Sequence, residues 1–166
     1  MSAETPVPDL EAPDPEPTPV RRACVVQLGG RAFAVDVADA REVVVLDATT
    51  PVPGAPASVL GVMNLRGNVL PVVEARLLLG LPVPAAPGRG HALVLADGER
   101  RAAILIERVL GLTAFETVRP LTERGDHEGL AAGELTAGSG GPATLLDARA
   151  VLAALRRRWN AASGGS

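Results

Sequence analysis

The sequence has few aromatic side chains and a single cysteine. Apart from histidine, its only aromatic residues are Phe33, Phe115 and Trp159, and it contains no tyrosine. Sites that stack nucleic-acid bases or cage a quaternary ammonium group need several rings, so both kinds of binding are disfavoured. The lone Cys24 excludes a disulfide framework within one chain and disfavours a cysteine-ligated zinc site.

Apolar residues are plentiful enough for a folded core. Hydrophobic residues make up 47% of the 166 positions and charged residues 21%, which is the balance of a globular protein. That length fits one domain or two small ones. The 18 glycines and 15 prolines predict many short elements rather than long helices.

The two ends of the chain differ in composition from the part between them. Residues 1–19 hold six prolines, five acidic residues and no basic residue, so we expect a disordered, extended leader. The whole chain carries a net charge of −3 and the leader −5, which leaves the rest near +2, too weak a field to predict nucleic-acid binding. We expect residues 160–166 to be a second flexible end and residues 20–159 to be the folded body.

Neither a secretory signal nor a membrane span is evident. The leader lacks a basic start and an apolar run, and no window approaches the roughly 18 apolar residues that a membrane helix needs. We therefore expect a cytoplasmic protein that does not insert into a membrane.

Turn residues divide the body into strands and two short helices. Gly29-Gly30, Arg66-Gly67-Asn68 and Asp97-Gly98-Glu99 each lie between β-prone runs and predict hairpins. A single helical turn is expected at residues 38–41. The predicted strands are residues 21–28, 31–37, 59–65, 69–73, 91–96, 100–107, 113–118, 134–137 and 143–146, and the predicted helices are residues 74–79 and 148–158, the second N-capped by Asp147.

The order of these elements repeats once along the chain. Glu74-Ala75-Arg76 and Asp147-Ala148-Arg149 each follow a strand and open a helix, 73 residues apart, while the turns at Gly30 and Gly98 are 68 residues apart. A duplicated β-rich body predicts two small β-barrels or half-barrels, approximately residues 20–80 and 91–159, with a groove between them. Chance similarity between short hairpins is the alternative.

Catalytic chemistry is poorly represented. The only histidines are His91 and His127, neither at metal-ligand spacing from the other, and no nucleophile-elbow motif is present. We therefore predict no enzymatic activity, no metal and no cofactor. Two alternatives stay open: a small-molecule or enzymatic barrel that uses Asp126, His127 and Glu128, and a nucleic-acid-binding barrel.

The most informative segment is residues 49–81. It couples a proline-rich loop to a strand that ends in the turn Asn64-Leu65-Arg66-Gly67. Gly67 permits a tight reversal, and a guanidinium held at such a turn can make bidentate contact with a carboxylate on another surface. The alternative is that Arg66 is an ordinary solvated turn residue.

This segment and its surroundings closely resemble the CheW-like domain family. The resemblance covers residues 22 to about 156 and is most specific in two runs, Pro51-Val52-Pro53-Gly54-Ala55-Pro56 and Leu60-Gly61-Val62-Met63-Asn64-Leu65-Arg66-Gly67-Asn68-Val69-Leu70-Pro71-Val72-Val73. Further matching runs are residues 25–31, 33–37, 40–43, 98–101, 104–111 and 145–152. Two positions depart from the family pattern: Ala103 stands where glycine is usual, and Glu107 where aspartate is more common.

The resemblance implies a mainly β fold and an adaptor function. The family fold is two small SH3-like, five-stranded β-barrel subdomains with short helices and a C-terminal helix, and elements can be exchanged between the barrels. Its members are non-catalytic adaptors that couple methyl-accepting chemoreceptors to a CheA-type histidine kinase. The implied partners are the cytoplasmic tip of the receptor and the regulatory domain of the kinase. A pathway for pilus motility or gene regulation, in place of flagellar taxis, is an open alternative.

Transferred by position, the resemblance implies a set of partner-binding residues. An apolar groove would accept the receptor tip while Arg66 and Glu42 fix its register. Ordinary core packing is the alternative role for the apolar members Ala40, Val43, Val109 and Leu112. The full set is Ala40, Glu42, Val43, Gly61, Asn64, Arg66, Gly67, Ala103, Val109 and Leu112.

Overall fold

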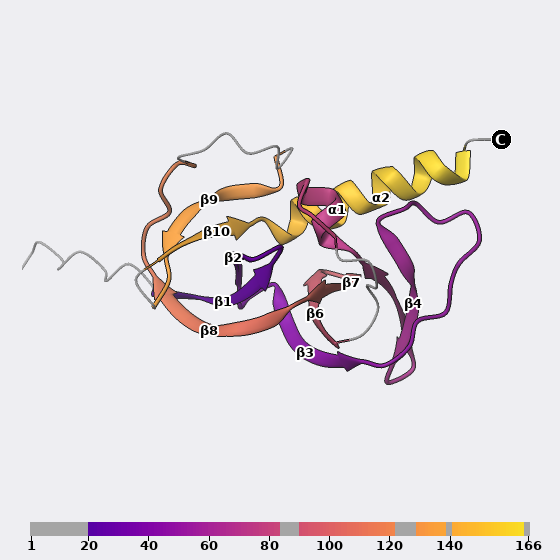
Figure 1. Cartoon of the computed structure of the whole chain (residues 1–166), viewed down its shortest axis with the longest axis horizontal. Helices are drawn as coiled ribbons and strands as arrows, with labels where there is room; N and C mark the ends of the chain where they lie inside the picture. The colour runs from indigo at the N-terminus through magenta and orange to yellow at the C-terminus, as the bar shows by residue number, and fades with distance from the viewer. Residues whose placement is uncertain (1–19, 84–89, 122–128, 139–140, 165–166) are drawn as a thin grey trace, which may run out of the picture.

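A computed structural model describes residues 20–83, 90–121, 129–138 and 141–164 of the chain. These residues form two lobes, each built on a curved sheet. A long C-terminal helix runs over the lobe that contains the strands labelled β4, β6 and β7 (Figure 1). Within them, no helix is both long and apolar enough to cross a membrane. The elements in chain order are β1 (Arg21–Leu28), β2 (Arg31–Asp36), β3 (Ala40–Leu46), β4 (Val59–Leu65), β5 (Asn68–Val73), α1 (Ala75–Leu79), β6 (Gly90–Asp97), β7 (Arg100–Ile106), β8 (Arg108–Phe115), β9 (Ala131–Thr136), β10 (Pro142–Leu146) and α2 (Ala148–Gly164).

The hairpin and helix predictions are largely confirmed. β1–β2, β4–β5 and β6–β7 are antiparallel hairpins at the predicted turns. α1 ends at Gly80, which adopts the left-handed conformation (φ 70°) that glycine permits at a helix C-terminus. At the start of α2, the Asp147 carboxylate accepts a hydrogen bond from the backbone N–H of Ala150, as expected of an N-cap.

Three local predictions were wrong. Residues 38–41 contain no helical turn, because the chain enters β3 at Ala40. The strand predicted at residues 113–118 starts earlier, at Arg108, since backbone pairing with β1 extends it. Residues 160–164 are not a flexible end but continue α2, because Ala161 and Ala162 are strong helix formers; residues 165–166 lie outside the described residues, as does the leader.

The two sheets exchange strands between the two halves of the sequence. The first sheet has the order β8-β1-β2-β10-β9 and the second has the order β3-β6-β7-β5-β4. Each sheet therefore combines the hairpin of one half with three strands of the other. If each strand of the first sheet is replaced by the strand five places before or after it in the chain, so that β1 becomes β6 and β8 becomes β3, the order of the second sheet results. Each sheet also contains one parallel pair, β2 with β10 and β5 with β7. The two sheets therefore share one topology, as expected of an internal repeat.

Equivalent glycines reinforce this correspondence. Gly61 in β4 and Gly133 in β9 have φ values of 156° and 152°, and a Cβ on either would lie 2.5 Å from a backbone oxygen, that of Thr50 or Arg119. In each case the residue after the glycine forms an isolated bridge with that same loop residue. Only glycine allows a loop to approach a bulged strand so closely, so these positions are structural.

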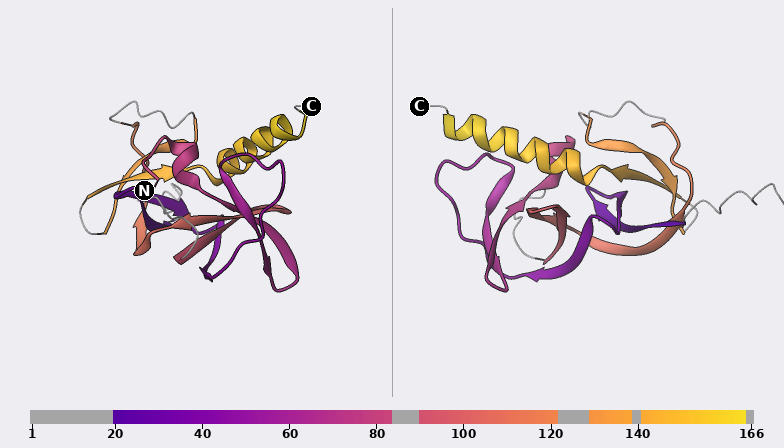
Figure 2. Two further views of the ribbon diagram at one scale, coloured as in Figure 1. Left: turned by 45° about the vertical axis from the view of Figure 1, so that its right-hand side comes forward. Right: turned by 180° about the vertical axis from the view of Figure 1, so that it is seen from behind.

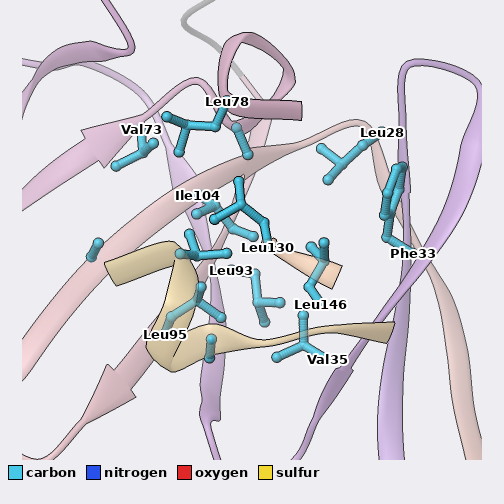
Figure 3. Packing of buried hydrophobic residues seen from close by; sticks show 14 of the residues in the cluster. Leu28, Phe33, Val35, Val73, Leu78, Leu93, Leu95, Ile104, Leu130 and Leu146 are labelled. Carbon is cyan, nitrogen blue, oxygen red and sulfur yellow. The ribbon is translucent and has the colours of Figure 1, made fainter. Parts of the chain in front are cut away.

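Alternation along the strands divides the core into three clusters. On β1, Cys24, Val26 and Leu28 point into the main cluster, which lies between the two sheets and the two helices, while Ala23 and Val25 point into a cluster in the first sheet. A third cluster fills the curved face of the second sheet. Figure 3 shows the main cluster, where Phe33 and Val35 from the first sheet converge with Leu93 and Ile104 from the second and with Leu78 from α1.

The coarse fold prediction is confirmed: the molecule is mainly β, with two five-stranded sheets and a C-terminal helix. The finer expectation of closed SH3-like barrels is not. The recorded pairing leaves each sheet open, with β8 and β9 at the edges of the first and β3 and β4 at the edges of the second.

Candidate functional site

The turn between β4 and β5 has an unusual backbone. The ladder closes at Leu65 and Asn68, leaving a two-residue loop in which Arg66 (φ 50°) and Gly67 (φ 87°) both have positive φ. Such loops match the twist of a hairpin, but the conformation disfavours residues with a Cβ. Arg66 is the one non-glycine residue with positive φ in the described part of the chain. The side-chain oxygen of Asn64 accepts a hydrogen bond from Gly67 N–H at 2.8 Å and holds the turn.

Arg66 makes a bidentate ion pair with Glu42. Its Nη1 and Nη2 donate to Oε1 and Oε2 of Glu42, both at 2.7 Å. Glu42 lies on β3 and Arg66 follows β4, so the pair joins the two edges of the second sheet across its curved face. The sequence predicts a carboxylate on another surface, whereas the carboxylate that Arg66 binds in the structure is Glu42 of the same chain.

The ion pair stays open to solvent. The side chain of Arg66 is 72% exposed and that of Glu42 29% exposed. Hydrogen bonds from Arg66 lower the pKa of the Glu42 carboxyl, and the positive charge of Arg101 acts in the same direction. The same hydrogen bonds raise the pKa of the Arg66 guanidinium. The pair is thus fully charged at neutral pH, and three of the five N–H donors of the guanidinium are unused by Glu42.

Exposed apolar side chains gather on the edge strands β3 and β8. These two strands lie along the same side of the molecule, the lower one in Figure 1 and again in the rear view of Figure 2. Both are edges of the sheets that the described residues form, so one side of each strand has no neighbouring strand among those residues and could pair with another chain. We call the following side chains the edge-strand patch: Val43, Val45, Val109, Leu110 and Leu112.

The predicted site residues fall into three groups. Asn64, Arg66, Gly67 and Glu42 meet at the β4–β5 turn. Val43, Val109 and Leu112 are exposed members of the edge-strand patch. The rest are Ala40, which is half-buried against the main core cluster, and Gly61 and Ala103, which are buried.

Ala103 and Gly61 are therefore unsuited to direct partner contact. Ala103 has no exposed surface and packs in the core of the second sheet. Gly61 is covered by the backbone of Thr50. Both shape the sheet that carries the Arg66 turn.

Sequence reasoning missed two members of the patch. Val45 is 64% exposed and Leu110 is 46% exposed. The signal for Val45 was present, since Arg41, Val43 and Val45 share one face of a strand by alternation. Leu110 could not be found in this way, because a bulge in the pairing of β1 with β8 breaks the alternation there.

The described residues give no support to metal binding or to thiol chemistry. No group of His, Cys, Asp and Glu side chains among them is arranged to hold a metal ion. His91 is exposed, and burial raises the pKa of the Cys24 thiol, which keeps it in the unreactive form. Asp126, His127 and Glu128 lie outside the described residues.

Comparison with known proteins yields a family match over most of the chain. The CheW-like domain profile matches residues 22–156. "Probable chemotaxis protein CheW" of Rhizobium etli is 31% identical over 106 residues, which is 62% of this chain and 68% of the relative. "Chemotaxis protein CheW" of Rhizobium meliloti is 37% identical over 86 residues, or 52% and 55% of the two chains. The matched region thus spans between about half and two thirds of these relatives.

A solved structure supports the same fold. The crystal structure of the scaffolding protein TtCheW from Thermoanaerobacter tengcongensis superposes with a TM-score of 0.68 over 89% of each chain, at 16% sequence identity. At that identity the likeness concerns the architecture alone.

Proposed function

Because this chain belongs to the CheW-like domain family, we propose that it is a non-catalytic adaptor that couples methyl-accepting chemoreceptors to a CheA-type histidine kinase. The observation that carries the proposal is the Arg66–Glu42 pair. It is a preformed bidentate contact on a strained, exposed turn beside an open sheet edge. Strained backbone at an exposed polar site is more typical of recognition than of stability.

Arg66 is prepared to bind a partner. Glu42 holds the guanidinium in one orientation, so less side-chain entropy is lost when a partner docks. The N–H groups not used by Glu42 can donate to a carboxylate or amide oxygen on another surface. Glu42 therefore positions Arg66, and Arg66 makes the contact.

The edge-strand patch supplies the apolar part of the proposed interface. Leu112, at 66% exposure, and Val45, at 64%, each leave most of their surface in water, and burying such surface favours association. We propose that the apolar side chains of a receptor tip pack on this patch while Arg66 fixes their register. An interface of standard size with these features fits micromolar affinity, which suits an array held by many weak links.

The experiment is a binding titration against two purified partners, a receptor-tip hairpin fragment and the kinase regulatory domain. Arg66→Glu reverses the exposed charge, and we expect it to weaken receptor binding by about tenfold or more, as loss of a charged contact does. Arg22→Glu is the matched control, because Arg22 is an exposed arginine in the first sheet, away from the turn.

A charge-swapped variant separates direct contact from turn stability. Glu42→Arg combined with Arg66→Glu keeps an ion pair at the turn but reverses the charge offered to a partner. We expect it to fold normally and to bind as poorly as Arg66→Glu alone. Wild-type affinity in Arg66→Glu would refute the proposed role.

A further inference from the structure

A second surface feature lies beside α2. None of the proposed partner-binding residues lines it. It is a depression of about 340 Å³ between α2 and the strands β5 and β7. Its floor is apolar and includes Pro71, Leu155 and Trp159. Trp159 is the only tryptophan in the chain and is half-buried against the main core cluster. We call this depression the α2 groove.

Three arginines surround the α2 groove. Arg100 and Arg101 come from β7 and Arg156 from α2, and all three are exposed. None of them forms an ion pair with a carboxylate of the described residues. Tryptophan and arginine are the residue types most enriched at the energetic centres of protein interfaces. The groove therefore fits an acidic segment that also carries apolar groups.

The chain itself contains such a segment. Residues 1–19 carry five carboxylates and no basic residue, and they include six prolines together with Val7 and Leu10. Proline-rich segments bind aromatic-lined grooves in the extended polyproline conformation, which costs them little entropy. Carboxylates between the prolines can form charge-assisted hydrogen bonds with arginines. We propose that residues 1–19 dock on the α2 groove of the same chain.

The length of the leader is sufficient. β1 begins at the end of the molecule opposite the C-terminal end of α2 (Figures 1 and 2). A domain of this size is roughly 40 Å across. At about 3.1 Å per residue, the stretch from Pro6 to Glu11 lies about 28 to 43 Å along the chain from Val20. The N-terminal half of the leader, which carries Glu4 and Asp9, is thus long enough to reach the groove while residue 19 stays joined to Val20.

Docking would have a consequence for the neighbouring Arg66 turn. Arg101 borders the α2 groove, and its charge also acts on Glu42. Carboxylates bound at Arg101 would reduce the positive charge near the turn. A docked leader would then change the charge that the Arg66 turn offers to a partner. The inference itself depends only on the groove and the leader, and not on which partner Arg66 binds.

Fluorescence of Trp159 tests the docking directly, because no other tryptophan contributes. The full-length chain is compared with a full-length variant in which all five leader carboxylates are made neutral: Glu4→Gln, Asp9→Asn, Glu11→Gln, Asp14→Asn and Glu16→Gln. A tethered segment has an effective concentration near millimolar, so a weak site is about half occupied. We expect acrylamide to quench Trp159 up to about twofold more strongly in the neutral variant.

Groove variants supply the second arm. Arg100→Glu combined with Arg156→Glu should increase quenching as the neutral leader does, whereas the control Arg22→Glu should leave it at the wild-type value. High salt should raise quenching in the wild type and have little effect on the neutral variant. Equal quenching in wild type and neutral variant would overturn the proposal. Quenching that rises when the wild type is diluted would also overturn it, because it would show that the leader of a second copy occupies the groove.

Discussion

The molecule contains two bidentate arginine–glutamate pairs with nearly equal hydrogen-bond lengths but opposite surroundings; Arg66 uses Nη1 and Nη2, and Arg76 uses Nε and Nη2. Arg66 grips Glu42 through two hydrogen bonds of 2.7 Å, and Arg76 grips Glu74 through two of 2.6 and 2.7 Å. The first pair lies on the surface, with the Arg66 side chain 72% exposed. The second lies inside, with side-chain exposures of 5% for Arg76 and 0% for Glu74.

The buried pair is part of a network that joins the two sheets. Glu107, between β7 and β8, accepts a hydrogen bond from Arg76 at 3.4 Å and one from Gly29 N–H, in the β1–β2 turn, at 2.6 Å. The network thus ties α1 to both lobes. The Glu107 carboxylate thus contacts partners from both halves of the network.

Since the hydrogen bonds of the two pairs are about equally short, we expect the difference in burial to decide how much each pair contributes to stability. Water screens the exposed pair and solvates either member when the other is removed, so its contribution to stability is small. The buried pair has no such replacement, because loss of one member leaves an uncompensated charge in the core. The surface pair can therefore take part in binding at little cost in stability, whereas the buried pair is required for the stability of the fold.

Breaking the buried pair should have the largest effect. We expect Arg76→Ala to lower the free energy of unfolding by about 3–5 kcal/mol, because it strands the Glu74 carboxylate in the core. Urea or guanidinium denaturation followed by circular dichroism measures this change. A loss below about 1 kcal/mol would mean that water reaches Glu74 and that the two pairs are alike.

A double substitution distinguishes charge from packing. Glu74→Met together with Arg76→Met removes both charges and keeps unbranched side chains in the site. It should recover most of the stability lost in Arg76→Ala, since buried ion pairs are often replaceable by apolar residues. A double variant that is no more stable than Arg76→Ala would show that lost packing causes the destabilisation.

The sequence allowed prediction of those parts of the fold that local chemistry determines. Gly29-Gly30 and Gly98 predicted their hairpins because few other residues adopt the backbone angles required. Gly67 predicted the tight turn after Asn64 for the same reason, while the partner-binding role of the turn is implied by the family resemblance and stays a prediction. Asp147 was correctly predicted as a helix cap.

The features that escaped prediction depend on contacts between distant residues. The pairing of β1 with β8 joins segments more than 80 residues apart in sequence, and no local pattern specifies it. The Glu74-Ala75-Arg76 motif correctly predicts the start of α1, but no local pattern indicates that Glu74 and Arg76 are buried or that Arg76 contacts Glu107. The family resemblance places Ala103 in the partner-binding groove, but the structure buries it in the core of the second sheet, where residues of β3 and β5 pack around it.

A change at the exposed pair should separate binding from folding. Asn tolerates positive φ, so Arg66→Asn keeps the backbone of the turn and removes the guanidinium. We expect the melting temperature to stay within about 2 °C of the wild type, while affinity for the receptor-tip fragment falls. Thermal denaturation and the binding titration together test this.

Arg66→Ile is the matched variant for the backbone. It also removes the guanidinium, but a β-branched residue strongly disfavours positive φ, so it should lower the melting temperature clearly below that of Arg66→Asn. Equal melting temperatures for the two variants would show that the turn does not require the left-handed conformation. Retained binding in Arg66→Asn would place recognition elsewhere on the surface.

The smallest expected effect comes from pH. Hydrogen bonds from Arg66 lower the pKa of Glu42 below its ordinary value of 4.5, so the pair adds stability above that value and loses it as pH falls through the lowered pKa. NMR titration of the Glu42 carboxyl should therefore give a pKa below 4.5 in the wild type and a higher one in Arg66→Asn. A carboxyl that titrates at the same pH in both proteins would show that the pair does not form in solution, and Arg66 would then lose the preorganisation on which its contrast with Arg76 depends.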